Sequence, residues 1–434
     1  MTQVIENLGI EERVAQFRPY VDSITLKARQ AFRQMRQLDG ASRNHILIEL
    51  AAQLESSNCQ HSIILANQKD IELAQKNNMS SAMIDRLKLD SKRILSIAQA
   101  VREIAAFDDP IGEVIRGQYL PNGVQMVQKR VPLGVVFTVY ESRPNVTIDV
   151  AALCIKSGNA AILRGGKEAF FSNMSLYQVF VSVLASVGID SSAVQLVEET
   201  DRACMLALLE RDDRIDLAVP RGGEGLIKFV SQNTRIPVVK HDKGVCNLFI
   251  DESADLDKSI KIAINAKLQR PSVCNSIENL LIHSKFTQSK ELLQALDTAG
   301  AELIGCNRSL QLYPNMRLIT DDDTEYGTEY LDNRLAVKIV ESLDEAVDFI
   351  YRYGSGHSEA IVTEKLVSAQ QFENRIDSAT VFVNCSTRFH DGGQMGMGAE
   401  VGISTGRLHV RGPMGVRDLT TTTYVMTGNG QVRS

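Results

Sequence analysis

Hydrophobic positions in the amino-terminal part of the chain recur every three or four residues, as they do along one face of a helix. Apolar residues at this spacing cover 24–38 and, after an Asp-Gly pair, 46–54. Two short runs that alternate between polar and apolar residues then flank a Pro-Asn-Gly turn at 121–123, which predicts a β-hairpin over 118–129. We therefore expect helices first, followed by a hairpin that can pair with another subunit.

From residue 132 onward the pattern changes to short, nearly continuous apolar runs separated by helical stretches. Strands and helices that alternate at this length are typical of βαβ units and predict a parallel, doubly wound sheet. Such strands are buried on both faces, and ligands bind at their carboxyl ends, near helix amino termini. The expected strands are 133–140, 159–164, 194–197, 215–219, 236–241 and 247–250, and the expected helices are 146–156, 168–187, 201–209 and 226–230.

A sharp turn follows between a helical run at 260–268 and an apolar run at 280–282. The residue before Pro271 is disfavoured in a helix, so the helix must end there. Cys274 lies on this turn, where a thiolate nucleophile can be presented to a cleft, although an isolated cysteine is more often buried and inert. A second α/β region extends from the turn to about residue 382, with expected strands near 278–282, 317–319, 335–340 and 360–362, and an extended run follows at 420–426.

The composition is that of an ordinary soluble globular protein with two or three structural units. The chain has 434 residues, of which 44% are hydrophobic and 23% are charged. A net charge of -6 without a basic block argues against nucleic acid or an acidic membrane surface as a partner. The apolar runs are short for a membrane span, and the amino terminus lacks a signal-peptide pattern. Seven cysteines without CxxC spacing indicate a reducing, cytoplasmic location and no structural metal site.

Two glycine-rich turns at expected strand ends are candidate phosphate sites. One contains Gly165 and Gly166 between Arg164 and Lys167, and the other is the RGGEG segment at 221–225. Glycines let a backbone approach a ligand closely, and the adjacent cations suit phosphate. Ordinary turns with solvated cations are the alternative for each, and no GxGxxG or Walker motif accompanies them. Two such turns in one sheet favour a nucleotide.

The segment 402–406 matches the GxSxG pattern of a serine hydrolase. That pattern requires a strand, a tight turn and a helix, with an acid and a histidine following in order. Here His409 lies only three residues beyond the second glycine, and Pro413 follows closely. We therefore do not expect a serine hydrolase.

A dense, ordered series of motifs extends from about residue 20 to the end of the chain. The motifs are VPLGVV at 131–136, YESRPNV at 140–146, SGNA at 157–160, RGGKE at 164–168, PRGG at 220–223, QRPSVCN at 269–275, GSGHSE at 354–359, STRF at 386–389, GAEVGIST at 398–405 and RGPMG at 411–415. This series resembles the γ-glutamyl phosphate reductase (glutamate-5-semialdehyde dehydrogenase) family of the aldehyde dehydrogenase superfamily.

The resemblance implies an α/β, aldehyde-dehydrogenase-like fold with a Rossmann-like cofactor domain, a second α/β domain and a small β arm. It also implies NADPH-dependent reduction of L-glutamyl 5-phosphate to L-glutamate 5-semialdehyde with release of phosphate, the second step of proline biosynthesis. A homo-oligomer is implied, with glutamate 5-kinase as a further partner to consider. The implied division is an NADP-binding domain at 1–116 and 130–255, a catalytic domain at 256–382, and an arm with an active-site closing loop at 117–129 and 383–434.

The same resemblance assigns roles to individual residues. Cys274 matches the nucleophile, and Asn145 matches the asparagine whose amide faces the developing oxyanion together with the Cys274 backbone N–H. One such donor is typically worth about 3 kcal/mol in the barrier. Glu329 matches the glutamate that holds the nicotinamide ribose, although the usual Phe-Gly-Pro after it is replaced here by 331–333.

Further cofactor contacts are implied at the two glycine-rich turns. Arg164 and Lys167, with Gly165 and Gly166 between them, match the segment that meets the adenosine ribose and its 2′-phosphate. The pyrophosphate is expected along the second turn, at Gly222 and Gly223.

One departure from the superfamily is informative. Hydrolytic aldehyde dehydrogenases carry a glutamate that activates water, and the equivalent segment here, 240–244, reads KHDKG. A positioned base typically contributes about a hundred- to ten-thousand-fold to a rate, so hydrolysis of a thioester should be slow without one. Phosphate can then be the exchanging group.

Cations near the turn are candidates for binding phosphate or the substrate carboxylate, and a surface ion pair is an equally good role for each. These candidates are Arg143, Arg270, Lys240 and Lys243. His241 and His390 are weaker candidates for proton donation. Two rival functions remain, namely a hydrolytic aldehyde dehydrogenase of another small semialdehyde and a non-catalytic nucleotide-binding protein. The missing glutamate argues against the first, and the Cys274 and Asn145 pair argues against the second.

Overall fold

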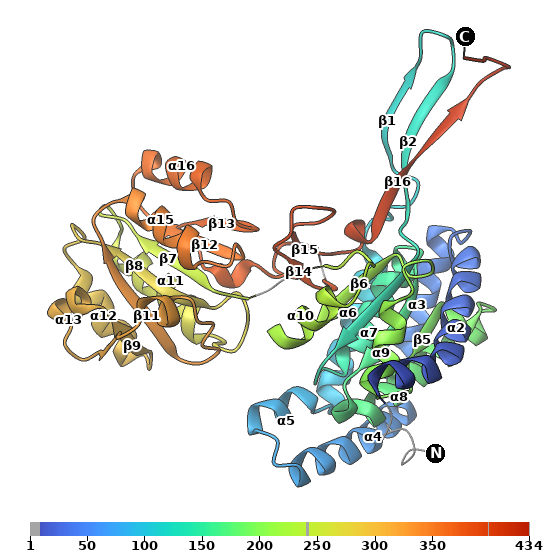
Figure 1. The fold of residues 1–434 in the computed structure, drawn as a ribbon, viewed down its shortest axis with the longest axis horizontal. Helices are drawn as coiled ribbons and strands as arrows, with labels where there is room; N and C mark the ends of the chain where they lie inside the picture. The colour runs from blue at the N-terminus through green and yellow to red at the C-terminus, as the bar shows by residue number, and fades with distance from the viewer. Residues whose placement is uncertain (1–8, 240–242, 398, 434) are drawn as a thin grey trace. The chain divides into compact units, whose positions relative to one another are not determined.

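The computed structural model describes residues 9–239, 243–397 and 399–433, which form two compact units (Figure 1). Unit 1 consists of Met1–Lys240, Gly396–Gly402 and Met414–Ser434, and unit 2 consists of His241–Met395 and Ile403–Pro413. The carboxyl-terminal part of the chain therefore contributes to both units.

A parallel sheet forms the centre of unit 1, as the alternating pattern predicts. Its strands, in spatial order, are β5 (Val194–Leu196), β4 (Ala160–Gly165), β3 (Val135–Tyr140) and β6 (Leu217–Arg221). Alternate side chains point to opposite faces of a strand. Val135, Phe137 and Val139 of β3 accordingly join one core, while Val136 is buried on the other face. Both faces of the sheet are therefore covered.

Helices supply this cover. Nearly every residue of α7 (Asn145–Lys156) is buried, because this helix packs against β4 on one side and against α3 (Gly40–Glu55) and α6 (Ser91–Ala106) on the other. The helical segment Lys167–Ser186 is long and apolar enough to cross a membrane by length and composition alone. In the structure it packs against neighbouring helices and β5. The other helices are α2 (Ile10–Met35), α4 (Ser57–Lys76), α5 (Ser81–Leu87), α8 (Phe170–Ser186), α9 (Arg202–Leu209) and α10 (Glu224–Gln232), with short 3₁₀ turns η1 (Lys167–Ala169), η2 (Ser191–Ala193) and η4 (Arg417–Leu419).

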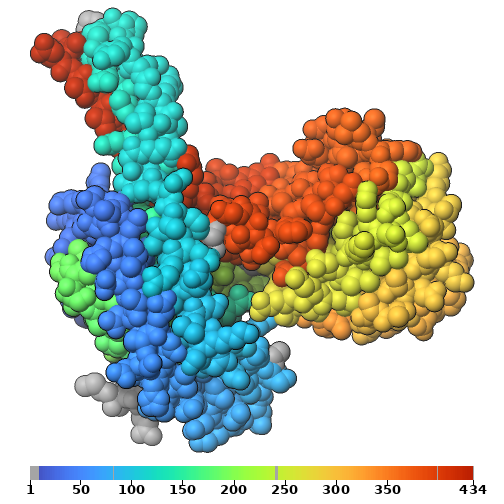
Figure 2. All heavy atoms as spheres, turned by 180° about the vertical axis from the view of Figure 1, so that it is seen from behind, coloured from blue at the N-terminus to red at the C-terminus, as the bar shows by residue number. Residues whose placement is uncertain are grey.

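A three-stranded antiparallel arm extends from the helices of unit 1 (Figures 1 and 2). Its strands are β1 (Val114–Tyr119), β2 (Gln125–Pro132) and β16 (Thr420–Thr427). The predicted hairpin is confirmed: Gly123 supplies the positive φ of the turn, at 80°, and β2 pairs with β16 along its whole length. The arm exposes apolar side chains on both outer strands, among them Tyr119, Tyr424 and Met426.

Seven parallel strands form the sheet of unit 2, so the second predicted α/β region is also confirmed. In spatial order they are β10 (Arg317–Leu318), β9 (Glu302–Gly305), β11 (Arg334–Val340), β8 (Ile277–His283), β7 (Cys246–Ile250), β12 (Ser358–Val362) and β13 (Thr380–Val383). One core includes Leu248 and Ile250 and the other includes Phe249 between them, because successive side chains of β7 face opposite sides.

Helices cover both faces of this sheet as well. The first core takes residues from α11 (Leu256–Leu268) and α12 (Ser289–Thr298), and the second takes residues from α15 (Leu343–Tyr353) and α16 (Leu366–Arg375). The remaining elements are α13 (Asn307–Leu312), α14 (Asp322–Tyr326), η3 (Thr387–Phe389), β14 (Ile403–Ser404) and β15 (Gly412–Pro413).

Three differences from the sequence expectations concern the organisation of the chain. The segment expected as a strand at 236–241 forms only an isolated bridge between Val238 and Ala218, and its last two residues lie outside the described residues. β7 belongs to the sheet of unit 2, whereas the expected division grouped it with the NADP-binding domain. Ser404 lies buried in β14, which pairs with β15 and leads into no helix, so the GxSxG match is no nucleophile elbow.

Candidate active site

Cys274 lies on the turn between α11 and β8, where the sequence pattern places it. Helix α11 ends at Leu268, and the turn closes through a hydrogen bond from the Ser276 N–H to the Val273 carbonyl of 3.0 Å. The Ser276 hydroxyl also donates to the Lys267 carbonyl, at 3.3 Å. Cys274 is partly exposed on this turn. Cys274 is therefore partly in contact with solvent on a backbone that these hydrogen bonds hold.

A buried ion pair joins the two elements on either side of the turn. Lys267 Nζ, in the last turn of α11, donates to Glu278 Oε2 in β8, and both side chains are fully buried. Burial raises the pKa of Glu278 and lowers that of Lys267, while the charge of each partner opposes the shift of the other. Neither residue was singled out from the sequence, because buried pairs have no local signature.

Gly244 brings Glu329 and Cys274 to the same place. A Cβ built on Gly244 would lie 2.6 Å from the Cys274 Cα and 2.7 Å from Glu329 Oε1. The backbone at residue 244 therefore packs against Cys274, and any larger side chain would displace one of these groups. The structure thus brings together two of the predicted site residues, Cys274 and Glu329, within unit 2.

Beneath the turn lies a buried chain of polar groups. The Cys246 thiol donates to the Cys274 carbonyl at 3.1 Å and lies 3.6 Å from His357 Nδ1. The Ser358 hydroxyl then lies 2.8 Å from His357 Nδ1 and 2.7 Å from His390 Nδ1. Burial raises the pKa of the Cys246 thiol well above its ordinary value, so it remains a neutral donor. This chain holds the Cys274 peptide in place.

Arg388 is a residue near Cys274 to which the sequence assigned no role. Its Nε donates to Gln269 Oε1 at 2.9 Å, and its Nη1 donates to Asn275 Oδ1. The Asn275 carbonyl accepts from the Thr387 hydroxyl at 2.6 Å. These hydrogen bonds connect the 3₁₀ turn η3 to the loop that carries Cys274.

In unit 1, Asn145 occupies the first turn of α7, directly after β3. Its Nδ2 donates to Asp149 Oδ2 at 2.8 Å, one helical turn further on. Burial raises the pKa of Asp149 to about 6, against the opposing influence of Asn145 and of the Arg221 charge. Arg221 also lies 3.8 Å from Glu400. The amide of Asn145 is thus oriented by a neighbouring carboxyl group.

The turn at Gly222 and Gly223 is closely packed on one side and open on the other. A Cβ on Gly222 would collide with the Glu141 carboxylate and with Leu226, whereas one on Gly223 would meet nothing within 4 Å. The Gly223 N–H donates to Glu141 Oε2 at 3.1 Å, and α10 begins here without a side-chain cap. The Leu226 N–H donates to the Gly223 carbonyl at 3.0 Å, so the start of α10 is a candidate anion site that already has the Glu141 carboxylate beside it.

The other glycine-rich turn separates its two cations. The guanidinium of Arg164 is nearly buried and donates to the carbonyls of Thr200, at 2.8 Å, and Asp201, at 3.1 Å. Lys167 is exposed at the surface instead. Arg164 therefore fixes the start of α9, and Lys167 is the cation that a ligand can reach.

The two glycines of the turn at 164–167 lie close to neighbouring side chains. A Cβ on Gly165 would collide with the Asn173 amide, and one on Gly166 would collide with the Glu168 carboxylate. Glu168 Oε1 also accepts from the Ser142 N–H at 2.6 Å. The turn after β4 is thereby linked to the segment that precedes Asn145.

The remaining cation candidates differ in exposure. Arg270 is exposed, and Arg143 and Lys243 are half-buried. Lys240 and His241 lie outside the described residues. The described residues contain no group of three or more His, Cys, Asp or Glu side chains that could hold a metal ion.

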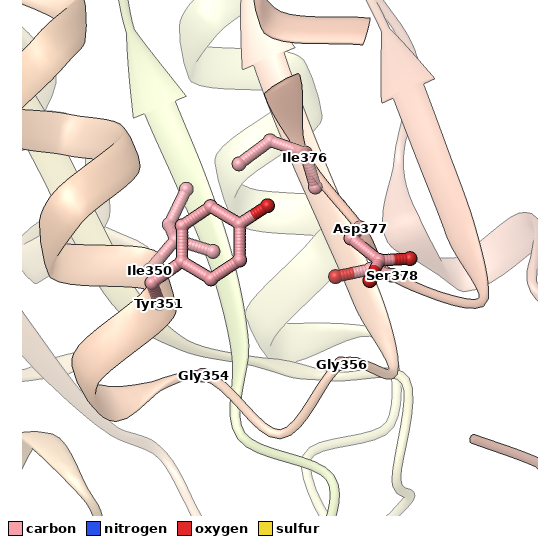
Figure 3. Close-up of a pocket in the computed structure, with 7 residues that line it drawn as sticks. All are labelled: Ile350, Tyr351, Gly354, Gly356, Ile376, Asp377 and Ser378. Atoms are coloured by element: carbon pink, nitrogen blue, oxygen red, sulfur yellow. The ribbon is translucent and has the colours of Figure 1, made fainter. Parts of the chain in front are cut away.

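A small pocket occurs elsewhere in unit 2 (Figure 3). Ile350 and Tyr351 line one side of it, and Asp377 lies on the other. Arg411 and Arg407 both pair with the Asp377 carboxylate. None of the candidate site residues that the structure describes lines this pocket. We therefore regard the pocket as structural.

Comparisons with known proteins agree with the resemblance that the motifs indicate. The profile of the aldehyde dehydrogenase family matches residues 15–305. A γ-glutamyl phosphate reductase from Leptospira interrogans is 56% identical over 95% of this chain and 99% of its own, and one from Nautilia profundicola is 47% identical over 94% and 98%.

The fold agrees with solved structures of the same superfamily. The crystal structure of γ-glutamyl phosphate reductase from Thermotoga maritima superposes with a TM-score of 0.91 at 40% identity, covering 95% of this chain and all of that one. An acetylating aldehyde dehydrogenase from Geobacillus thermoglucosidasius shares the fold at 16% identity, with a TM-score of 0.71 and coverage of 97% and 99%. The expected aldehyde-dehydrogenase-like fold is confirmed, and the chain belongs to the γ-glutamyl phosphate reductase family of the aldehyde dehydrogenase superfamily.

Proposed function

We propose that the protein reduces L-glutamyl 5-phosphate to L-glutamate 5-semialdehyde with NADPH and releases phosphate, as the second step of proline biosynthesis. Its family consists of oxidoreductases that use a nicotinamide cofactor. The observation that carries the proposal is the position of Gly244 against the Cys274 backbone. A hydrolytic enzyme needs a base near its thioester, and the segment 240–244 offers no glutamate there.

In the proposed reaction the Cys274 thiolate attacks the γ-acyl carbon of the substrate. A sulfur–carbon bond forms, and the electron pair of the carbonyl moves to oxygen, where the Asn145 amide and the Cys274 N–H stabilise it. The carbon–oxygen bond to phosphate then breaks, and phosphate leaves with the bonding electrons. The result is a thioester on Cys274.

When bound, the cofactor would supply the hydride that reduces this thioester to the aldehyde, and the carbon–sulfur bond would break to release the Cys274 thiolate. The residues of unit 1 fit its phosphate groups. The uncapped start of α10 and the open side of Gly223 suit the pyrophosphate, and exposed Lys167 suits a 2′-phosphate. Arg164 is engaged with backbone carbonyls and does not fit that role. In unit 2, the Glu329 carboxylate would hold the nicotinamide ribose.

The test is the reverse reaction, in which purified protein reduces NADP⁺ with glutamate 5-semialdehyde. We expect turnover to depend strictly on inorganic phosphate, with sulfate at the same ionic strength as the control. Equal rates in phosphate and sulfate would mean that water resolves the thioester, and the acyl-phosphate proposal would fail.

A hydrolytic aldehyde dehydrogenase is the second candidate, because one carboxylate does lie near the nucleophile. A Cβ on Gly244, which would touch the Cys274 backbone, would also lie 2.7 Å from Glu329 Oε1. If Glu329 were a general base, Glu329→Gln would abolish phosphate-independent oxidation. If it binds the nicotinamide ribose, the same substitution would mainly weaken cofactor binding.

We further propose a cytoplasmic homo-oligomer that is assembled through the arm. Support comes from the apolar side chains exposed on β1 and β16, whose outer edges are unpaired within the described chain. Glutamate 5-kinase, which would supply the acyl phosphate, remains a candidate partner.

A further inference from the structure

The guanidinium of Arg388 is held in a fixed position beside the nucleophile. Two of its nitrogens donate to side chains on either side of Cys274, namely Gln269 and Asn275. Among the described residues, its third nitrogen, Nη2, has no hydrogen-bond partner. The side chain is half-buried, so the remaining donors face a partly dry environment, where a charge-assisted hydrogen bond is stronger than in water.

A second cation accompanies it. Burial lowers the pKa of Arg388, and the nearby positive charge of Arg270 lowers it further. Arg270 forms no ion pair with any described residue. A guanidinium stays protonated in proteins, so the two side chains repel each other rather than lose a proton.

The negative charge available nearby is limited. Asp391 and Cys274 oppose the shift of Arg388, but Asp391 Oδ1 already accepts from the N–H groups of Gly393, at 3.0 Å, and Gln394, at 3.2 Å. Beside Arg388 lie one further positive group, Arg270, and two groups that can carry negative charge, Asp391 and the Cys274 thiolate, so the two guanidinium groups still repel each other. An anion that binds there would relieve the repulsion.

We propose that Arg388 and Arg270 form the binding site for the phosphoryl group of the substrate, which rests on the proposed function. When Cys274 forms its bond to the acyl carbon, the bond between that carbon and the oxygen bridging to phosphorus breaks, and its electron pair leaves with the phosphate. The two guanidinium groups balance that charge, with Nη2 of Arg388 as the free donor. In the reverse direction the same site holds inorganic phosphate for attack on the thioester.

The substrate carries a second anion, its α-carboxylate, which would suit two arginines equally well. The two sources are distinguishable because inorganic phosphate and the semialdehyde are separate substrates of the reverse reaction. A phosphoryl site changes the KM for phosphate, whereas a carboxylate site changes the KM for the semialdehyde.

The experiment measures both KM values in the reverse reaction for Arg388→Gln and Arg270→Gln. We expect the KM for phosphate to rise about ten- to hundredfold in Arg388→Gln, as for loss of a hydrogen bond to a charged group, with little change for the semialdehyde. Arg388→Lys should recover part of this loss. The matched control is Arg308→Gln, because Arg308 pairs at the surface with Glu341 in the same unit and should leave both values unchanged.

A purely structural role is tested by Gln269→Met, which removes one hydrogen bond to Arg388 and leaves its charge. If this variant raises the KM for phosphate as much as Arg388→Gln does, Arg388 acts only by holding the loop and the proposal is wrong. A rise confined to the KM for the semialdehyde would also overturn it. If Arg388→Gln does not fold, the exposed Arg270→Gln decides by the same criteria.

Binding of phosphate can also be measured without turnover. Phosphate should slow the alkylation of Cys274 by iodoacetamide, followed by mass spectrometry of its peptide, and should do so less in Arg388→Gln. If phosphate protects Cys274 in the wild type but turnover does not depend on phosphate, the proposed function is contradicted and the anion site is supported. If turnover depends on phosphate but phosphate protects Cys274 equally in the wild type and in Arg388→Gln, only the anion site is contradicted.

Discussion

At the scale of single residues, the hydrogen bond between Asn145 and Asp149 links a titratable group to the proposed oxyanion donor. Because the pKa of Asp149 is about 6 in the folded protein, its carboxylate is the stronger acceptor above that pH. We expect kcat to fall as the pH drops through about 6. Asp149→Asn keeps an acceptor at this position and should remove that inflection from a pH–rate profile measured between pH 5 and 8.

The free energy of unfolding should change with pH in the opposite direction to kcat. The folded pKa of Asp149 lies above its ordinary value of 3.8, so the native state binds more protons than the unfolded chain between about pH 4 and 6. The contribution of Asp149 to stability is therefore lost as the pH rises through that window. Asp149→Asn should flatten this part of a urea-unfolding series, and an unchanged slope would contradict the raised pKa.

Cys274→Ser should remove turnover and leave cofactor binding intact. A serine hydroxyl is far less nucleophilic at neutral pH than a thiolate, so no covalent intermediate should accumulate. NADPH fluorescence titration measures the binding, and wild-type affinity is the expected result because the cofactor phosphates are assigned to unit 1. Retained activity would contradict the assignment of Cys274.

Residues of the site differ in how far the sequence can reveal them. The position of Cys274 on a turn is predictable because Pro271 ends a helix just before it, whereas its role as nucleophile rests on the family resemblance. Asp149 lies four positions after Asn145 on one helix, so the i, i+4 rule could have paired them. Arg388 is 113 positions from Asn275, and only the folded chain brings the two together.

At the scale of elements, the Lys267–Glu278 pair connects the end of α11 to the start of β8 across the Cys274 turn. Removing one partner leaves the other charge buried and unpaired, which typically costs about 3–5 kcal/mol. We expect Lys267→Met and Glu278→Gln each to lower the free energy of unfolding strongly, as measured by chemical denaturation.

The double variant Lys267→Met with Glu278→Leu supplies the control. Replacing a whole buried pair by apolar groups of similar size is often close to neutral. The double variant should therefore be more stable than either single variant. If the double variant is the least stable of the three, the two residues act independently, and the proposal that their ion pair stabilises the turn is wrong.

Length alone did not decide which strands were predictable. β9 and β13 have four residues each and were missed, whereas the shorter β5 and β10 were predicted. β6 continues through Pro220, beyond its expected end at 219. Proline lacks an N–H and is tolerated there because β6 is the edge strand of its four-stranded sheet.

At the scale of the whole molecule, the arm is the feature on which assembly should depend. Tyr424 and Met426 are more than half exposed on β16, on one face of the strand. Lysines at both positions should repel an approaching edge, so Tyr424→Lys with Met426→Lys is expected to lower the mass measured by light scattering after size-exclusion chromatography.

The control for this prediction is Leu366→Lys, at an apolar side chain that is 72% exposed on α16 of unit 2. Its mass should equal that of the wild type. An unchanged mass in the arm variant, at a concentration where the wild type is oligomeric, would show that assembly does not depend on this face of β16.

The division of the chain into units was the least predictable level. β7 has the same apolar pattern as the strands before it, and only its pairing with β8 and β12 assigns it to unit 2. The segments after Met395 return to unit 1 twice, and no change of composition marks these crossings.

The pairing of β2 with β16 has a consequence for synthesis on the ribosome. Gln128 and Thr422, which share a hydrogen bond across these strands, are 294 positions apart. At ordinary translation speeds the hairpin emerges on the order of tens of seconds before its third strand exists. During that interval one edge of β2 has no partner, so nascent chains on neighbouring ribosomes could pair through it. Newly made protein should therefore be most prone to aggregate before its last residues are translated.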